Sequence, residues 1–567
     1  MTTGYPARAS SGWRYAAAIL CLPLLILFST RSNLYETSTL DPFVYLGYIS
    51  DYGDLVGRYG RTYYSIRLAH ILPNKWAAYL LGDTLGYYVI RYILLALTVG
   101  SIYRIARHYT TEYPAWLISI FFSSHVWLLS EVLWDHYSGT VLVCALVSIA
   151  LLLPSRHEIT SHALAGVAAA LAANGNPVGL FIVLAFGPAW LIERRGQPWK
   201  RVAFCLGAAV AGFALCYSML ILSMVILYPG ASWQFDQTTL DMLSYLFSGG
   251  GANWFNNLRQ IFVDLSLYET LIFPFFLALS IAAVLANWRA GPDERRKAIA
   301  AASFVVLMVL FFAVFHFVLR WGVLSLHYYL CYFMPAAVLA TASLIGKRRF
   351  SRGRTAIAVV ALLLLATHFA LWRELAALPF AFELITLSFC SLGWLLVTAA
   401  LNKAQGVTAI FVLLIAIFSS DAFFNGQRFK RLYGADPVND IEWDVRNGAL
   451  YMSRFIAQEV PGGAPVGFWY SARDYQLNAV QSTHLWGYSR VAGTAAGDAP
   501  MPAVDVAARE KLKKSKYIAL LGTEDEIQAG VAALATAGFA TSQAAHGQFQ
   551  GHNWPGYRIL LLRKEDR

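Results

Sequence analysis

Apolar runs of roughly twenty residues recur along the first 425 positions of the chain, separated by short polar connections. A run of this length can cross the ~30 Å hydrocarbon core of a bilayer as an α-helix, which satisfies its backbone hydrogen bonds internally. We therefore expect about thirteen transmembrane helices. They are predicted at 15–30, 84–107, 113–133, 138–153, 161–173, 178–192, 202–228, 270–287, 299–318, 328–345, 355–372, 377–401 and 406–424.

The composition agrees with a membrane protein. The chain is 57% hydrophobic and 14% charged, with a mean hydropathy of +0.50. Soluble proteins contain about 25% charged residues, so a soluble globule is excluded. The first apolar run has no small-residue cleavage site after it, and we interpret it as an uncleaved anchor.

The basic residues indicate an orientation. A net charge of +11 could suggest nucleic acid, but these residues lie in short connections between the predicted helices, and we expect no nucleic-acid partner. Every second connection is basic, at 104–107, 194–201, 295–297 and 347–354. By the positive-inside rule, the N-terminus is cytoplasmic and the C-terminal region is outside.

This orientation depends on the stretch "AANGNPVG". Two short apolar runs flank Asn174–Pro177, and merging them into one helix would invert everything that follows. Arg156 before the pair, with Arg194 and Arg195 after it, favours two short helices.

Two segments outside the apolar runs are large enough to contribute chemistry: a first outer loop at 31–83 and a C-terminal region at 426–567. The latter contains strand-like runs "VGFWY", "YIALLG" and "YRILLL", with a capping box at Thr523 and Glu526. The predicted fold class is therefore an α-helical multi-pass membrane domain (1–425) followed by a soluble, extracytoplasmic α/β domain (426–567).

The first outer loop is unusually polar between Asp41 and Pro73. If 41–52 is helical, one face presents Asp41, Tyr45, Tyr48 and Tyr52. A second group follows at Tyr63, Tyr64 and Arg67. A carboxylate, tyrosines and a guanidinium can together hold a polyhydroxy ligand and a phosphate. The alternative is a solvated loop whose tyrosines form an interfacial aromatic belt.

Other polar side chains are predicted at the same face of the membrane, where ionisable groups are costly and usually functional. "SEVLWDHYSG" contributes Glu131, Asp135 and His136, and "FVLRWGVLSLHYYLCYFMP" contributes Arg320, His327, Tyr328 and Tyr329. Structural roles remain open for several of them. Asp135 could cap the following helix, the histidines could be hydrogen-bonded interfacial residues, and Glu131 could be paired inside the bundle.

The order of these features resembles the GT-C superfamily of polyprenyl-phosphate-sugar-dependent glycosyltransferases. The bacterial members related to protein mannosyltransferases and to the aminoarabinose lipid A transferase are the most similar. The matching elements are Asp41, "TYYSIRLAHILP", "WDHYSG" and "HYYLCYFMP". The chain lacks the Asp-Glu pair of the protein mannosyltransferases, because Pro42 follows Asp41. No cofactor is therefore assigned, and a divalent metal ion is left open.

The resemblance implies sugar transfer from a polyprenyl-phosphate donor to a glycan, lipid or protein acceptor, in assembly of the cell envelope. A lipid phosphate is a good leaving group, so a general base and a cation suffice. Asp41 is the candidate base and Asp135 the second carboxylate. The candidate substrate-binding residues are Tyr45, Tyr63, Tyr64, Arg67, His136, Arg320, His327 and Tyr328.

Two other classes of protein are alternatives to this enzyme. A transporter or flippase of lipid-linked sugars should show repeat symmetry between its halves, and the sequence shows no such symmetry. A non-catalytic scaffold would not need the converging carboxylates. The expected location of the enzyme is the bacterial inner membrane, with the C-terminal domain in the periplasm.

The orientation can be tested with reporter fusions. Phosphatase and fluorescent-protein fusions at Lys403 and at the C-terminus should report opposite sides of the membrane, because one predicted helix separates them. Reports from the same side would show that the helix count is wrong.

Overall fold

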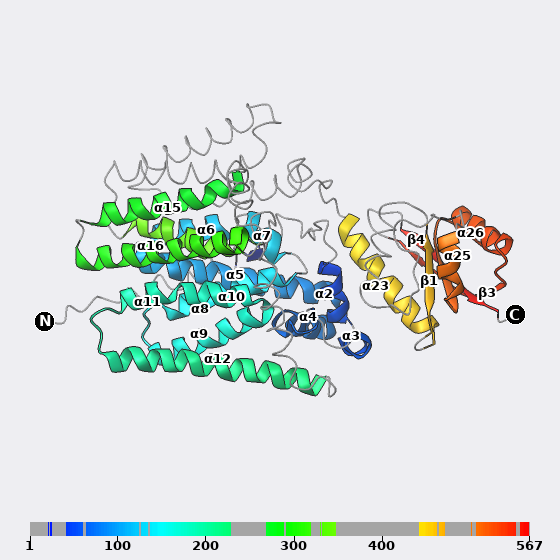
Figure 1. Ribbon diagram of the computed structural model, residues 1–567, viewed down its shortest axis with the longest axis horizontal. Coiled ribbons are helices and arrows are strands. Elements are labelled where there is room, and N and C mark those ends of the chain that lie inside the picture. The colour runs from blue at the N-terminus through cyan, green and yellow to red at the C-terminus, as the bar shows by residue number, and fades with distance from the viewer. Residues whose placement is uncertain are drawn as a thin grey trace, which may run out of the picture.

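The computed structural model describes residues 21, 23–24, 41–50, 52–59, 64–123, 126–133, 136–227, 268–288, 291–318, 329, 331–346, 441–461, 464–470, 501, 506–550 and 556–565. Within these residues the chain is mostly helical, with a bundle of long helices and a smaller unit of mixed helix and strand at one end of it (Figure 1). The predicted helices at 355–372, 377–401 and 406–424, and most of the helix at 15–30, lie outside the described residues.

The bundle begins with three helices of the first outer loop, α2 (Asp41–Ser50), α3 (Tyr52–Tyr59) and α4 (Leu68–Leu81). The helices that follow are α5 (Asp83–Tyr109), α6 (Glu112–Ser123), α7 (Val126–Val132), α8 (Tyr137–Leu152), α9 (Glu158–Gly175), α10 (Pro177–Ala185), α11 (Gly187–Glu193), α12 (Trp199–Leu227), α15 (Tyr268–Asn287), α16 (Pro292–Ala313) with a π-helical turn η2 (Val314–Val318), and a 3₁₀ turn η3 (Cys331–Phe333) leading into α18 (Met334–Ile345).

Three of the described helices are long and apolar enough to cross a membrane: Asp83–Tyr109, Trp199–Ile226 and Pro292–His316. Shorter apolar helices accompany them at Tyr137–Leu152, Pro177–Glu193, Phe276–Asn287 and Cys331–Ile345. The helix predicted at 113–133 corresponds to α6 and α7. The two helices predicted at 161–173 and 178–192 correspond to α9 and to α10 with α11. The number of thirteen crossings stays a prediction.

Glycines allow α9 and α12 to pack with their backbones in contact. A Cβ atom on Gly166 would lie 1.9 Å from the carbonyl oxygen of Ala209, and one on Gly212 would lie 2.0 Å from that of Ala163. Small residues at such crossings bring helices close enough for extensive van der Waals contact, the main attraction between helices in lipid.

The basic connections meet at one end of the bundle. Lys297 Nζ donates to the carbonyl oxygen of His108 over 3.3 Å, and Arg296 Nη1 donates to that of Arg195 over 3.4 Å. Nearby, Arg201 pairs with Glu158 at 2.6 Å. Connections far apart in the sequence therefore share this end, here called the basic end, as the alternating charge pattern predicted.

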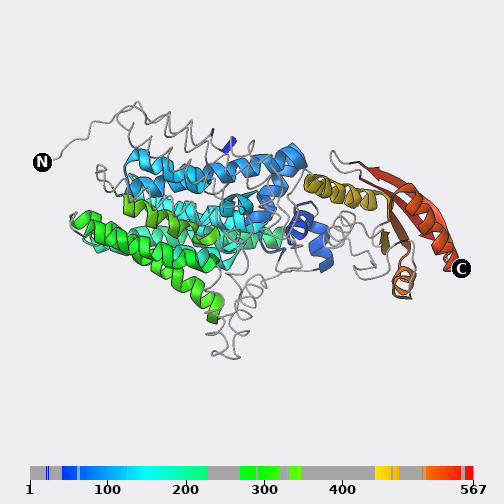
Figure 2. The same ribbon diagram turned by 90° about the horizontal axis from the view of Figure 1, so that it is seen from above.

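The smaller unit contains α23 (Ile441–Glu459), β1 (Val466–Tyr470), α25 (Val506–Lys513), β2 (Tyr517–Gly522), α26 (Glu524–Thr536), β3 (Thr541–Phe549) and β4 (Tyr557–Lys564). Its sheet has the order β1-β2-β4-β3, in which β1 and β2 are parallel and the other pairs antiparallel. Separate apolar clusters cover its two faces, one with α23 and one with α25 and α26. Figure 2 shows α23 between this sheet and the bundle.

Three of these strands occur where the sequence predicted them, and the capping box of Thr523 and Glu526 is present. The strand β3 was missed. Its side chains are mostly exposed and polar, so the sequence has no apolar alternation that would indicate a strand.

Two glycines of α12 provide a matched test of the helix packing. Gly212→Ala should lower the thermal unfolding midpoint in detergent, because overpacking a close contact costs about 1–3 kcal/mol. Gly207→Ala on the same helix is the control, since nothing lies within 4 Å of its added Cβ. Equal midpoints for the two variants would contradict the close crossing.

Candidate functional site

The site is organised around Tyr45 of α2, whose side chain is fully buried. Four rings surround it, with centroid distances of 5.4 Å to Tyr64, 5.5 Å to His70, 5.7 Å to His136 and 5.6 Å to Tyr137, all edge-on. Edge-to-face contact is a favourable arrangement of aromatic rings. Residues from α2, the turn before α4, α4 itself and the start of α8 therefore meet at one point.

Three tyrosines of the first outer loop do not belong to a solvated belt. Tyr45, Tyr48 and Tyr52 are all at most 3% exposed. The predicted helix at 41–52 corresponds to α2 and the first residue of α3, and Asp51 between them lies outside the described residues. The Tyr52 hydroxyl donates to the carbonyl oxygen of Ser65 over 3.0 Å. Burial, together with neighbouring Tyr48, raises the pKa of Tyr52 well above its ordinary value, so it remains a donor.

Arg67 places a buried positive charge beside Tyr45. Its side chain is 2% exposed, and its Cζ atom lies 3.4 Å from the ring centroid of Tyr137 and 5.6 Å from that of Tyr45. A guanidinium over an aromatic face is stabilised by about 2 kcal/mol or more where water is excluded. Because arginine does not deprotonate in proteins, the site keeps this charge at every physiological pH.

Asn174 fixes the turn that presents Arg67. Its Oδ1 accepts from the backbone N–H of Ala69 at 2.7 Å, and its Nδ2 donates to the carbonyl oxygen of Ile66 at 3.0 Å. The amide therefore bonds on both sides of Arg67: it satisfies an N–H group of the first turn of α4, and it joins the N–H of Leu68 as a donor to the Ile66 carbonyl oxygen. A residue more than a hundred positions away in the sequence thus sets the direction of the guanidinium.

Asn174 lies where α9 gives way to α10, because the sequence breaks the helix there. Asn176 adopts extended backbone dihedrals ahead of Pro177, as residues before proline prefer, and its Oδ1 caps α10 by accepting from the N–H of Val178 at 2.9 Å. The Asn176 Nδ2 donates to the hydroxyl of Tyr137 over 3.2 Å. Both asparagines of "NGNP" consequently face the site.

His136 caps the helix that carries Tyr137. Its Nδ1 lies 2.7 Å from the Ser138 hydroxyl and accepts from the Ser138 N–H at 3.4 Å. Glu131, 1% exposed, has an Oε2 3.9 Å from the same Nδ1 and lies buried inside the bundle. The cap of α8 is His136, whereas the sequence had suggested Asp135.

Further polar side chains extend from the site into the bundle. His70 Nδ1 lies 3.1 Å from the Thr140 hydroxyl, and the carbonyl oxygen of His70 accepts from Asn74 Nδ2 at 2.7 Å. Arg91 Nη1 donates to Asn74 Oδ1 at 3.5 Å, and its Cζ lies 4.6 Å from the ring centroid of Tyr87. This network connects the first turns of α4 to the membrane-spanning helix α5.

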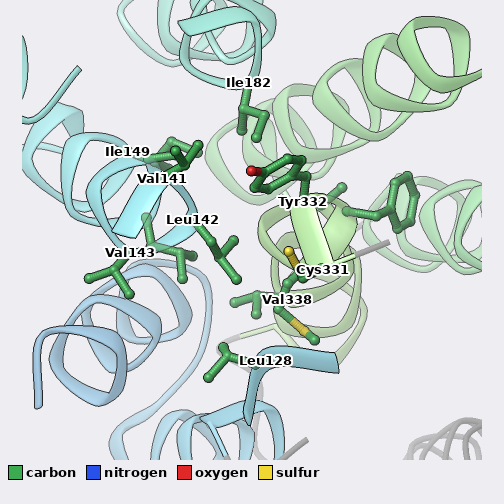
Figure 3. Close-up of a cluster of buried hydrophobic side chains, with 14 of the residues drawn as sticks. Leu128, Val141, Leu142, Val143, Ile149, Ile182, Cys331, Tyr332 and Val338 are labelled. Atoms are coloured by element: carbon green, nitrogen blue, oxygen red, sulfur yellow. The ribbon is translucent and has the colours of Figure 1, made fainter. Parts of the chain in front are cut away.

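A late segment of the chain closes the site from another side. Tyr329 and Tyr332 are buried, with ring centroids 5.9 Å apart. Figure 3 shows Tyr332 and Cys331 of η3 among side chains of α8 and α10, with Val338 of α18 beside them. The region "HYYLCYFMP" therefore reaches the same end of the bundle as Tyr137.

Among the predicted site residues, the structure brings together Tyr45, Tyr64, Arg67 and His136. Asp41 is the first residue of α2, and its side chain lies outside the described residues, as do Tyr63, Asp135, Arg320, His327 and Tyr328. Sequence reasoning missed Tyr137, His70 and Asn174. The sequence pointed to Asn174 only through the stretch "AANGNPVG", which interrupts an apolar run.

A divalent metal ion stays open as a prediction. No group of three or more His, Cys, Asp and Glu side chains arranged to hold a metal ion occurs among the residues that the structure describes. The side chains of the two candidate carboxylates, Asp41 and Asp135, lie outside those residues.

Comparison with known proteins identifies the fold. No model of a protein family matches the chain, and no curated protein sequence does. The structure of ArnT from Cupriavidus metallidurans bound to undecaprenyl phosphate matches with a TM-score of 0.52 and 13% identity over 98% of both chains. Its apo state matches with a TM-score of 0.50 and 15% identity over the same shares. The chain has the same fold as ArnT.

An oligosaccharyltransferase from Archaeoglobus fulgidus matches with a TM-score of 0.43 and 12% identity, over 90% of this chain and 70% of that one. That score is too low to support any inference. The GT-C fold rests on ArnT, and it confirms at the level of the fold the resemblance seen in the residues.

The role of Asn174 can be tested by hydrogen–deuterium exchange. Asn174→Ala should raise exchange at 64–70, because it removes the partner of the buried Ala69 N–H, at about 1–3 kcal/mol, and one of the two donors to the carbonyl oxygen of Ile66. Asn287→Ala is the matched control, since its Nδ2 donates to the carbonyl oxygens of Ala283 and Ser343 in another part of the bundle. Unchanged exchange at 64–70 in Asn174→Ala would contradict this role.

Proposed function

We propose that the protein is an integral-membrane glycosyltransferase that transfers a sugar from a polyprenyl-phosphate donor to an extracytoplasmic acceptor. The acceptor is a glycan, lipid or protein of the cell envelope. The GT-C fold supports this class of enzyme, and ArnT, which has the same fold, is bound to undecaprenyl phosphate in one of its structures.

The observation on which the proposal depends is the buried guanidinium of Arg67. The leaving group of the reaction is a lipid phosphate, on which negative charge grows as the bond to the sugar breaks. A fixed cation in a site that excludes water stabilises that charge without reorganising. Arginine also binds phosphate through two parallel N–H donors.

Tyrosines suit the other part of the donor. Their rings offer apolar faces for a sugar, and their hydroxyls can donate to and accept from its hydroxyl groups. Tyr45 and Tyr64 lie in contact with each other, and Arg67 lies beside Tyr45, so a sugar phosphate could meet both groups together.

Asp41 is the proposed general base. Positions 41 and 45 of α2 are four residues apart and lie on the same face of the helix, so Asp41 is on the side of Tyr45. A carboxylate there could take the proton of the acceptor hydroxyl while Arg67 holds the departing phosphate. Asp135, next to His136, is the second candidate carboxylate.

The two ends of the bundle support an outer site. Arg67 and its neighbours lie near the start of α5, where the Tyr87 hydroxyl donates to the carbonyl oxygen of Leu133. The basic end adjoins the other terminus of α5, at His108. With the basic end in the cytoplasm, by the positive-inside rule, the site faces the periplasm and takes its donor from the outer leaflet of the inner membrane.

The role of Asp41 can be tested by turnover. Asp41→Asn should still bind the donor but lower the rate by ~10²–10⁴, the usual contribution of a general base. The measurement is release of polyprenyl phosphate by purified protein supplied with lipid-linked sugar and acceptor. Asp293→Asn at the basic end is the matched control and should turn over normally.

The same assay distinguishes the alternatives. Near-normal turnover by Asp41→Asn would remove it from the mechanism and move attention to Asp51, Asp54 or Asp135. Equal activity with a nucleotide sugar alone would contradict the lipid-linked donor. Movement of the lipid-linked sugar between the two leaflets of a vesicle membrane, without release of polyprenyl phosphate, would instead support a flippase.

A further inference from the structure

The helix that begins with Asp41 and carries Tyr45 is packed between the bundle and the C-terminal unit. Val44, Tyr45, Tyr48 and Ile49 of α2 belong to the buried core of the bundle. Leu46, which is 3% exposed, belongs instead to the apolar cluster formed by α23 and one face of the sheet. A helix that is apolar on all sides is buried on all sides, and the partners of α2 come from two parts of the chain.

The geometry of the helix explains this division. Residues 44, 45, 48 and 49 have the i, i+1, i+4 and i+5 spacing of one helical face, and position 46 projects away from the centre of that face. The side of α2 that holds Tyr45 in the site and the side that holds Leu46 in the C-terminal unit are therefore different. A displacement of Leu46 therefore also displaces Tyr45, because both residues belong to one short helix.

The C-terminal partner of Leu46 is firmly attached to its own sheet. Leu450, Phe455 and Ile456 of α23 share the cluster with Phe468 of β1 and Leu561 of β4. Hydrogen bonds add to this packing. The Tyr557 hydroxyl donates to the carbonyl oxygen of Gly448, and the Tyr451 hydroxyl accepts from the N–H of Gln548 at 3.0 Å.

A second contact joins the same two parts. Arg454 of α23 forms an ion pair with Asp83, the first residue of α5. Both side chains are partly exposed, so the pair is worth only about 0–1 kcal/mol. The pair nevertheless fixes the position of α23 against the end of the bundle where α4 passes into α5, beside the candidate site.

We infer that the C-terminal unit positions α2, and through it Tyr45 and the candidate base Asp41, with Leu46 as the positioning residue. This inference rests on the proposed function, and it assigns to the C-terminal unit a positioning role in the proposed reaction. A catalytic group must be held close to its productive geometry, and a displacement of about 1 Å can cost ~10² in rate. The bundle covers one side of α2, and Leu46 supplies the support on the other.

The experiment compares two buried leucines of the full-length protein. Leu46→Ala removes the contact between α2 and the C-terminal cluster. Leu534→Ala makes the same change in α26, within the cluster on the opposite face of the sheet. The readouts are hydrogen–deuterium exchange at 43–50 without substrate, and kcat and KM for the lipid-linked donor.

Leu46→Ala should raise exchange at 43–50 and lower kcat by about 10-fold or more, with a smaller rise in the KM for the donor, because Tyr45 lies on α2 whereas the phosphate-binding Arg67 does not. Leu46→Met, which fills a similar volume, should restore both readouts. Leu534→Ala should lower the thermal midpoint of the protein and leave exchange at 43–50 unchanged. If Leu46→Ala does not fold, Leu46→Val gives a smaller change in the same direction.

Unchanged exchange at 43–50 in the Leu46 variants would overturn the inference, and so would an equal rise in Leu534→Ala. Raised exchange in Leu46→Ala, combined with a wild-type protein that releases no polyprenyl phosphate, would establish the contact and contradict the proposed function instead. The two ideas can therefore fail separately.

Discussion

The burial of a permanent positive charge at one end of a membrane bundle is the constraint on which the site depends. Removing a guanidinium from water costs several kcal/mol, and arginine cannot escape the cost by losing its proton. The fold places Arg67 over the ring of Tyr137 and beside Tyr45, and Asn174 bonds the backbone on both sides of it. A buried guanidinium is expected where an anion must be bound, and for this reason we propose that Arg67 binds the lipid phosphate.

The break between α9 and α10 makes this arrangement possible. Stopping α9 at Gly175 and restarting at Pro177 directs the Asn174 amide to that turn and the Asn176 amide to Tyr137. In a membrane, such a break is tolerated where other parts of the protein satisfy the freed polar groups.

Much of the helical architecture could be predicted from apolar runs, and the basic connections correctly predicted a shared end. The sequence also pointed to Tyr45, Arg67 and His136, because polar residues stand out beside apolar ones. It could not reveal Tyr137, His70 or Asn174 as their neighbours, since these contacts join segments far apart in the chain. The strand β3 was missed because its mostly polar, exposed residues produce no apolar periodicity.

The most direct test of the account is the binding of undecaprenyl phosphate to Arg67 variants, measured by native mass spectrometry in detergent. The account predicts that wild-type protein retains the lipid, that Arg67→Ala loses it, and that Arg67→Lys retains it weakly, because lysine keeps the charge but not the paired donors. Arg296→Ala at the basic end should bind as the wild type does. Equal retention by wild type and Arg67→Ala would contradict the central claim that the buried guanidinium is the phosphate site.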